Sequence, residues 1–230
     1  MTKGIKLNLI TYAVFLIIAA AGIAYGNAIQ NAFSNLRVWN LNTLLLLLVA
    51  VPFLFFQNKA GFPDFWESRI SNRYRIFLPL AMGIVFGLLD VLVFKVLLHP
   101  EPYTELPPFL QPFPYSILLY FSGALEVEVF YRLIPLTLIC ITGQWFKQGK
   151  YAHLFFWMAA ILTSVREPLE QLSGGSALLI LYSFASGFLM NFLQAIWYKK
   201  AGFPAALFIR LGHYLIWHIL LGVYVESVEL

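Results

Sequence analysis

Residues 113–142 read FPYSILLYFSGALEVEVFYRLIPLTLICIT, an apolar stretch with three ionisable side chains near its middle. About 20 apolar residues in a helix cross the hydrocarbon core of a bilayer, so this stretch predicts a membrane-spanning helix. A charged side chain inside hydrocarbon costs roughly 2.5–3.5 kcal/mol on insertion scales. We therefore expect Glu126, Glu128 and Arg132 to be paired, hydrated or lining a cavity, and they mark a candidate functional site.

The composition of the whole chain agrees with a membrane protein. Of 230 residues, 60% are hydrophobic and 11% are charged, and the mean hydropathy is +0.77. Soluble domains carry about 25% charged residues. The net charge of +4 is spread over short loops and forms no basic patch, so we expect the lipid bilayer as a partner and no nucleic acid. Residues 1–230 are expected to form a single transmembrane domain.

The sequence contains about seven apolar segments that are long enough, or nearly so, to cross the membrane. They cover residues 7–27, 41–57, 76–98, 113–142, 151–165, 176–198 and 204–224. The first lacks a clear small-residue cleavage site, so we interpret it as a retained span and not as a signal peptide. The expected fold is an all-α, polytopic transmembrane helical bundle of about seven spans.

The basic residues predict how this bundle is oriented, because cytoplasmic loops are enriched in lysine and arginine. The N-terminus and the second, fourth and sixth loops hold ten of the 15 basic residues, whereas the opposite side holds only Arg37 and Arg166. The ten are Lys3, Lys6, Lys59, Arg69, Arg73, Arg75, Lys147, Lys150, Lys199 and Lys200. We predict a cytoplasmic N-terminus and an external C-terminus.

Within the ionisable cluster, Glu128 and Arg132 are four residues apart and share one helix face. Glu126 lies about 200° around the helix from Glu128, given ~100° per residue. Either the helix is distorted there, or one glutamate is catalytic and the other pairs with a neighbouring helix. A buried ion pair that only fixes helix packing is the alternative. Because two acids accompany one base, we favour a carboxylate that acts as a general base.

The last apolar segment carries a polar stripe. Arg210, Tyr214 and His218 follow an i, i+4, i+8 spacing, and His213 lies alongside them. We expect this stripe to face the protein interior, opposite the fourth segment. Gly212 would let another helix approach closely. A hydrogen-bond network between helices, without catalysis, is the alternative interpretation of the stripe.

Other polar residues receive more ordinary interpretations. Glu167, Glu170 and Gln171 lie between the fifth and sixth segments, where a solvated loop is expected. If the fifth segment is short and re-entrant, these three side chains would instead fold into the cavity. Asn191 and Gln194 are expected to make packing hydrogen bonds.

Asp90 and Lys95 are five residues apart in the third segment, and we do not expect them to pair directly. Lys95 lies near the outer end, where it can extend toward the interface. Cys140 is the only cysteine, so an intrachain disulfide is excluded. His213 and His218 are poorly spaced for zinc on one helix face. No cofactor is expected, and a divalent metal bound together with the glutamates stays an open alternative.

Two stretches carry a resemblance to a known family. Glu128-Val129-Phe130-Tyr131-Arg132 matches part of a Glu-Glu-x-x-x-Arg motif, and Gly202-Phe203-Pro204 begins the final helix of a C-terminal core. Over about residues 110–221 the chain resembles the CPBP family, the CAAX-prenyl and bacteriocin-processing (Abi-type) intramembrane proteases. Val127 stands where the family has its first glutamate, and Glu126 is the nearest acid.

The histidine motifs of the family correspond less closely. The histidine of its second motif would fall near Gln171, with Glu167 at the position of a phenylalanine. Its third motif, His-x-x-x-Asn/Asp, is displaced, because His213 is followed four residues later by Trp217. Only Glu128, Arg132 and, loosely, one of the two histidines of the last segment therefore carry over.

The resemblance implies an intramembrane endopeptidase of a bacterial or archaeal cell membrane, acting on a membrane-associated peptide or protein. It assigns water activation to Glu128, with Glu126 as its partner or substitute, and an orienting charge to Arg132. His213 and His218 would donate hydrogen bonds to the developing oxyanion.

Two other classes of function stay open. A non-catalytic membrane scaffold or chaperone would keep the fold and its ion pair without cleaving anything. A small transporter would use Glu126 or Glu128 for proton coupling. A transporter of this kind is expected to show internal repeats and interrupted helices in matching halves, and no repeat is found in the sequence.

Overall fold

The computed structural model describes residues 2–33, 35–170 and 175–230, and the regular secondary structure in these ranges is entirely helical. The α-helices are α1 (Lys3–Ile29), α2 (Leu41–Leu46), α3 (Val51–Phe56), α4 (Leu78–Asp90), α5 (Tyr115–Glu128), α6 (Ile134–Trp145), α7 (Ala152–Glu170), α8 (Ala177–Ala201), α9 (Phe203–Tyr214) and α10 (Leu221–Tyr224). Each apolar segment expected from the sequence overlaps at least one of them, so the all-α class is confirmed.

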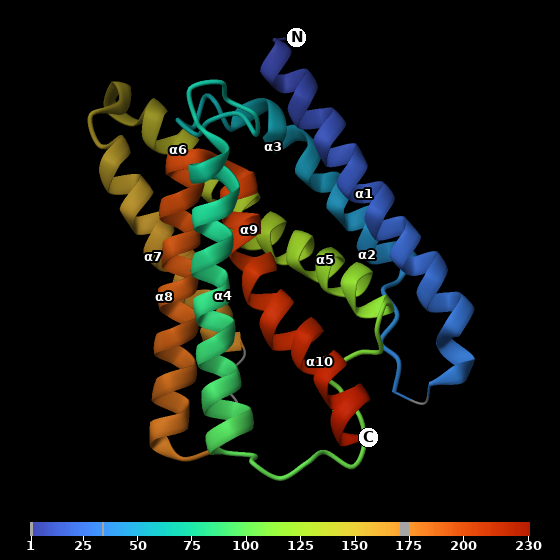
Figure 1. The fold of residues 1–230 in the computed structure, drawn as a ribbon. Coiled ribbons are helices and arrows are strands. Elements are labelled where there is room, and N and C mark those ends of the chain that lie inside the picture. The colour runs from blue at the N-terminus through green and yellow to red at the C-terminus, as the bar shows by residue number, and fades with distance from the viewer. Residues whose placement is uncertain (1, 34, 171–174) are drawn as a thin grey trace.

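Short 3-10 or π segments continue or join several of these helices. They are η1 (Gln30–Ala32), η2 (Leu47–Ala50), η3 (Arg73–Phe77), η4 (Val91–Leu97), η5 (Val129–Leu133), η6 (Phe146–Gly149), η7 (Leu215–Leu220) and η8 (Val225–Glu229). As a result α9, η7, α10 and η8 form one continuous helical rod that ends at the C-terminus (Figure 1).

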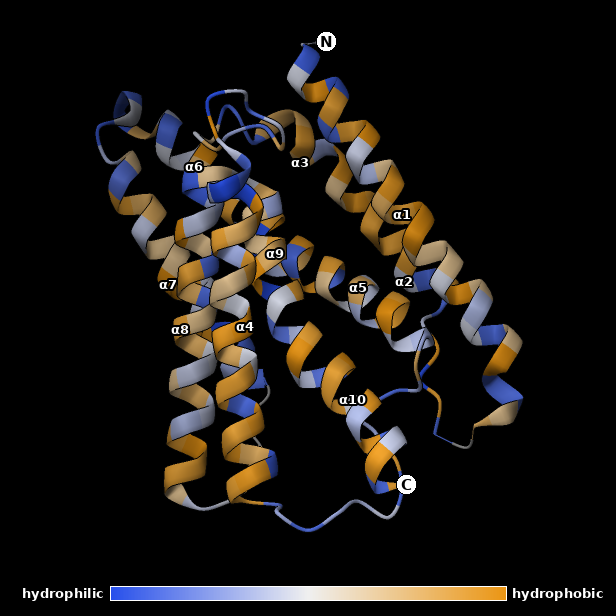
Figure 2. Cartoon of the chain, in the orientation of Figure 1, coloured by the Kyte–Doolittle hydropathy of each residue, from blue (hydrophilic) through white to orange (hydrophobic). Residues whose placement is uncertain are grey.

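Within the described ranges, four helical stretches are long and apolar enough to cross a membrane. They are Lys3–Ala32, Arg73–Leu97, Ala177–Ala201 and Phe203–Glu229, and Leu41–Phe56 is a shorter apolar helix. Figure 2 shows long hydrophobic stretches on α1 and α4 and hydrophilic residues near the N-terminal end of the bundle. These features are those of a membrane protein.

The two termini lie at opposite ends of the bundle (Figure 1). Helix α9 packs against α4, α5 and α8, while α1 packs on the other side of α5. At the end near the N-terminus, Gly202 adopts a φ of 82°, which glycine tolerates best, and Pro204 occupies the first turn of α9. This reversal places α8 and α9 side by side.

Helices α4 and α9 touch through their backbones. A Cβ atom added to Gly83 would lie 1.9 Å from the carbonyl oxygen of Ile209, and one added to Gly212 would lie 2.3 Å from that of Leu80. Gly87, one turn beyond Gly83, faces the carbonyl oxygen of His213 in the same way. The expectation that Gly212 admits a neighbouring helix is confirmed.

The π segment η5 follows directly after Glu128 and has a local cause. Pro135, in the first turn of α6, has no N–H to donate to the carbonyl oxygen of Tyr131 four residues earlier. The guanidinium of Arg132 takes that role, and its Nη1 donates to the Tyr131 oxygen at 2.9 Å. The helix is therefore distorted at the ionisable cluster.

Candidate functional site

Four charged side chains meet inside the bundle, each at most 4% exposed. Arg210 of α9 donates from Nη1 and Nη2 to the two carboxylate oxygens of Glu167 on α7, both at 2.6 Å. Its Nε donates to Oε1 of Glu128 on α5 at 3.0 Å. With Arg132 as the second cation, the four side chains form a cluster whose formal charges cancel. We call it the ion network.

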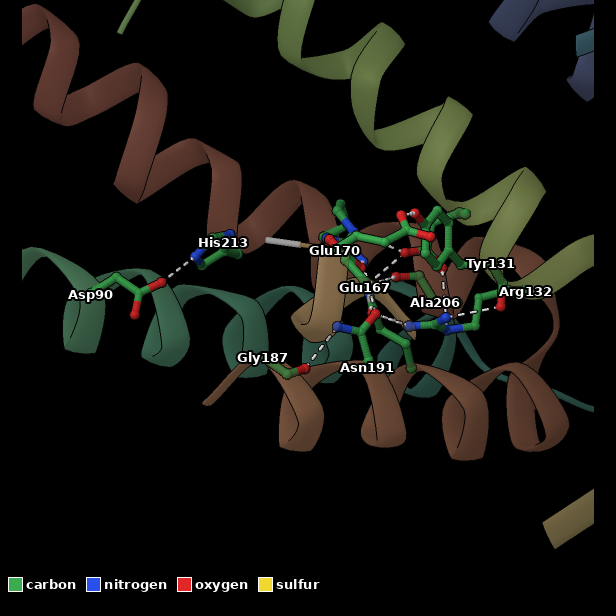
Figure 3. Close-up of polar contacts among 12 residues, drawn as sticks. Asp90, Tyr131, Arg132, Glu167, Glu170, Gly187, Asn191, Ala206 and His213 are labelled. Atoms are coloured by element: carbon green, nitrogen blue, oxygen red, sulfur yellow. Dashed lines mark hydrogen bonds and ion pairs between the residues drawn. The ribbon is translucent and has the colours of Figure 1, made fainter. Parts of the chain in front are cut away.

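Two amide side chains of α8 complete the ion network (Figure 3). Gln194 donates from Nε2 to Glu128 at 2.7 Å and accepts from Nη2 of Arg132 at 2.9 Å. The Oδ1 atom of Asn191 accepts from Arg132 and, at 3.1 Å, from Nη2 of Arg210. Asn191 and Gln194, expected to make packing hydrogen bonds, therefore bind charged groups. Such contacts offset part of the cost of burying two arginines and two glutamates.

Glu128 lies near two arginines, and Arg132, the partner inferred from the spacing, is the more distant of them. Oε2 of Glu128 and Nε of Arg132 are 4.0 Å apart, beyond hydrogen-bond distance. Arg210, 82 residues away in sequence, is the closer partner of Glu128. This contact also confirms that the polar stripe of the last segment faces the fourth.

A cavity of about 500 Å³ lies next to the ion network and is lined by residues from α4, η4, α5, α7, α8, α9, η7 and the segment before α2. Its polar lining includes Asp90, Glu126, Glu167, Arg210 and both histidines of the last segment. Glu128 does not line it. Glu126 and Glu128, two residues apart in α5, therefore occupy different environments, as their angular separation around the helix predicts.

Glu126 is half-buried at the wall of this cavity. The indole Nε1 of Trp39 donates to its Oε2 at 3.2 Å, and no ion pair forms on Glu126 among the described residues. Of the two candidate bases, Glu126 is thus the one that a molecule in the cavity can reach.

His213 lies about one turn beyond Arg210 on α9 and binds a residue that sequence reasoning did not include in the site. Its Nε2 is 2.7 Å from Oδ2 of Asp90, at the end of α4. The hydroxyl of Tyr182 on α8 donates to the other Asp90 oxygen at 2.8 Å. Asp90 and His213 both line the cavity. An acid within an apolar segment was itself a signal of this role.

His218 is fixed by the Pro-rich segment between η4 and α5. Its Nδ1 lies 2.8 Å from the carbonyl oxygen of Phe109, and its ring stacks on Tyr120 of α5 at a centroid distance of 4.3 Å. Because a carbonyl only accepts, Nδ1 carries the proton, and Nε2 of the neutral ring is left as an acceptor. His218 can therefore accept a hydrogen bond in the cavity.

The expectation of a solvated loop around Glu167 is wrong. Helix α7 extends as far as Glu170, and Glu167 is 4% exposed within the ion network. Glu170 is exposed and pairs with Arg166 at 2.8 Å. Hydrogen bonds from Tyr131 and Arg166 hold the pKa of Glu170 below its ordinary value. Gln171 lies outside the described residues.

Lys95 also departs from expectation, since it turns inward and is 7% exposed. Its Nζ lies 2.9 Å from Glu229 near the C-terminus and donates to the carbonyl oxygen of Glu101 at 2.8 Å. The backbone N–H of Tyr103 donates to the second Glu229 oxygen at 2.8 Å. Asp90 and Lys95 do not pair with each other, as predicted. These contacts tie the Pro-rich segment to the C-terminal helix.

In the part of the chain that the structure describes, no group of three or more histidine, cysteine, aspartate or glutamate side chains could hold a metal ion. Comparison of the chain with protein-family models, with curated proteins and with solved structures gave no match. The likeness to CPBP proteases therefore depends on the residues named in the sequence, and its consequences for function are proposals.

Proposed function

We propose that this protein is a membrane-embedded endopeptidase of CPBP type that cleaves a membrane-associated peptide with water activated by Glu126. One observation carries the proposal. Glu126 shares a cavity of about 500 Å³ with His213 and His218, and its carboxylate is engaged only by an indole N–H among the described residues. The resemblance gave Glu128 the same task, but two hydrogen bonds already occupy its Oε1.

The proposed reaction uses the cavity side chains in turn. The Glu126 carboxylate removes a proton from water, and the hydroxide adds to the carbonyl carbon of the peptide bond. In its doubly protonated form, with Nε2–H bonded to Asp90 as counter-charge, His213 donates a hydrogen bond from Nδ1 to the carbonyl oxygen as that oxygen becomes negative. The C–N bond then breaks, and the proton held by Glu126 passes to the leaving nitrogen. The ion network, with Arg132, Glu128 and Arg210, holds α5, α8 and α9 in register around these groups.

The proposal includes seven spans in a cell membrane, bacterial or archaeal, with a cytoplasmic N-terminus and an external C-terminus. The distribution of basic residues supports this orientation. The positions of the termini at opposite ends of the bundle are consistent with an odd number of passes (Figure 1).

A non-catalytic scaffold is the second candidate, and the closed ion network favours it. Arg210 binds Glu167 and Glu128 together and so holds three helices to one another. Glu128 and Arg132, the two residues that match the family motif, do not line the cavity. Such a protein would bind a membrane partner and leave it intact.

Two matched substitutions, Glu126→Gln and Glu128→Gln, test the proposal. Both replace a carboxylate by an amide of similar volume, two residues apart in one helix. In vesicles containing quenched fluorescent transmembrane peptides, Glu126→Gln should abolish cleavage and leave the melting temperature unchanged. Glu128→Gln should lower the melting temperature, because it leaves buried arginines short of a partner. Full cleavage by folded Glu126→Gln would refute the assignment, and wild-type protein without cleavage of any peptide would favour the scaffold.

A further inference from the structure

Arg37 is held at the cavity by two buried side chains that clamp its backbone. Its N–H donates to Oε1 of Gln111 at 2.8 Å, and its carbonyl oxygen accepts from the hydroxyl of Tyr115 at 2.7 Å. Gln111 and Tyr115 are 2% and 1% exposed. A residue whose peptide groups are bonded on both sides has little freedom to move its Cα atom. The backbone of Arg37 is therefore fixed at the cavity by the fold.

The guanidinium of Arg37 has no counter-charge among the residues that the structure describes. Arg37 is exposed and lines the cavity, yet among the described residues no carboxylate lies within ion-pair distance of it. Arg166, the other basic residue predicted on the external side, is neutralised by Glu170 at 2.8 Å. Arginine without a partner at a preformed site suits an anionic ligand group, because its planar fork binds phosphate or carboxylate with two hydrogen bonds.

The other walls of the cavity point to an amphiphile. Apolar and aromatic side chains, among them Phe94, Leu119, Met190 and Trp217, lie in the same lining as Arg37. Trp39, two residues after Arg37, places an aromatic ring beside it, as is common at a membrane interface. The acidic side chains of the lining, Asp90, Glu126 and Glu167, are already engaged by His213, Trp39 and Arg210. A ligand with an anionic head and an apolar body therefore satisfies Arg37 and the apolar part of the lining. In a membrane protein the abundant molecule of that chemistry is a phospholipid.

We propose that Arg37 binds the phosphate of a membrane phospholipid whose acyl chains enter the cavity along its apolar wall. This proposal does not rest on the proposed function, since lipid binding requires neither Glu126 nor His213, although lipid and peptide would share the cavity. It also gives the cavity a natural occupant when no peptide is bound.

The test compares purified wild-type protein with Arg37→Gln and Arg37→Lys, and uses Arg166→Gln as the matched control. Each protein is titrated in detergent with phosphatidic acid, with diacylglycerol of the same acyl chains, and with inorganic phosphate, and the melting temperature is recorded. Phosphatidic acid should raise the melting temperature of wild type and Arg166→Gln. Arg37→Gln should lower the apparent affinity about tenfold or more, the loss expected of a charge-assisted bidentate contact. Arg37→Lys should fall between the two.

The other arms decide the source of the phosphate. Diacylglycerol should give a much smaller shift, because it keeps the acyl chains and lacks the phosphate. An equal shift with inorganic phosphate at the same concentration would overturn the lipid assignment in favour of a free-phosphate site. An equal phosphatidic acid shift in Arg37→Gln and wild type would overturn the role of Arg37 altogether.

Discussion

Arg210 and Glu167 form a bidentate ion pair in which two hydrogen bonds of 2.6 Å connect α9 to α7 inside the bundle. The residues are 43 positions apart, and neither helix could bury its charge alone. Since Arg210 also binds Glu128, one guanidinium joins three helices. Bidentate arginine–carboxylate contacts are among the strongest polar contacts in proteins. We therefore expect this pair to control stability more than any surface pair.

Glu167→Gln is predicted to destabilise the protein by about 3 kcal/mol, the lower part of the range for a buried pair that loses one partner. The value is at the lower end because Glu128 still accompanies Arg210. Glu170→Gln, one turn later in α7, should change stability by less than about 1 kcal/mol, since Glu170 is exposed. Unfolding in mixed micelles measures both. Equal effects of the two substitutions would contradict a structural role for the ion network.

Gly83→Ala is predicted to destabilise the bundle by about 1–3 kcal/mol or more, because the new methyl group would collide with the Ile209 carbonyl. Gly123→Ala is the control. No atom lies within 4 Å of a Cβ added there, and alanine is the better helix former by about 1 kcal/mol. Melting temperatures should move in opposite directions. A neutral Gly83→Ala would mean that α4 and α9 are not in backbone contact.

Reporter fusions at Gly149 and at Leu230 are predicted to report opposite sides of the membrane. Gly149 lies between Lys147 and Lys150, in the loop that the basic-residue distribution assigns to the cytoplasm. Each position is fused in turn to alkaline phosphatase, which is active outside the cytoplasm, and to green fluorescent protein, which fluoresces inside it. Phosphatase activity should appear only at Leu230, and fluorescence only at Gly149. The same side for both would overturn the seven-span arrangement.

Lys95→Gln is predicted to loosen the Pro-rich segment between η4 and α5, because Glu229 would lose its ion-pair partner. Hydrogen exchange should accelerate at Tyr103, whose N–H is bonded to the same carboxylate. Lys150 is exposed and makes no ion pair among the described residues, so Lys150→Gln should leave that exchange unchanged. Exchange at Tyr103 that is equal in both variants would show that Lys95 does not hold the segment.

The helices and their inward faces were predictable from the sequence because hydrophobic length and helical spacing are local properties. The separation of Glu126 from Glu128 around one helix, and the inward stripe of Arg210 and His218, follow from about 100° per residue. Gly212 was recognised for a similar reason, since a residue without a side chain in an apolar helix signals close approach.

The partners within the site could not be predicted, because they join residues far apart in the chain. Glu128 binds Arg210 across 82 positions, and His213 binds Asp90 across 123. Spacing within one helix suggests Arg132 as the partner of Glu128 and gives no partner for His213. Glu167 was misjudged because the apolar run before it ends early, although α7 continues and buries it.

The glycine contact between α4 and α9 decides which walls of the cavity can move. Gly87 presses on the backbone of His213, and Asp90 follows it by three residues on the same helix. Two helices in backbone contact cannot part slightly without leaving a void, so Asp90 and His213 travel as one rigid half of the chamber. For the peptidase proposed above, a peptide would therefore have to enter by a movement of elements outside this contact, such as α5 and the segment that carries Arg37, which line other walls of the cavity.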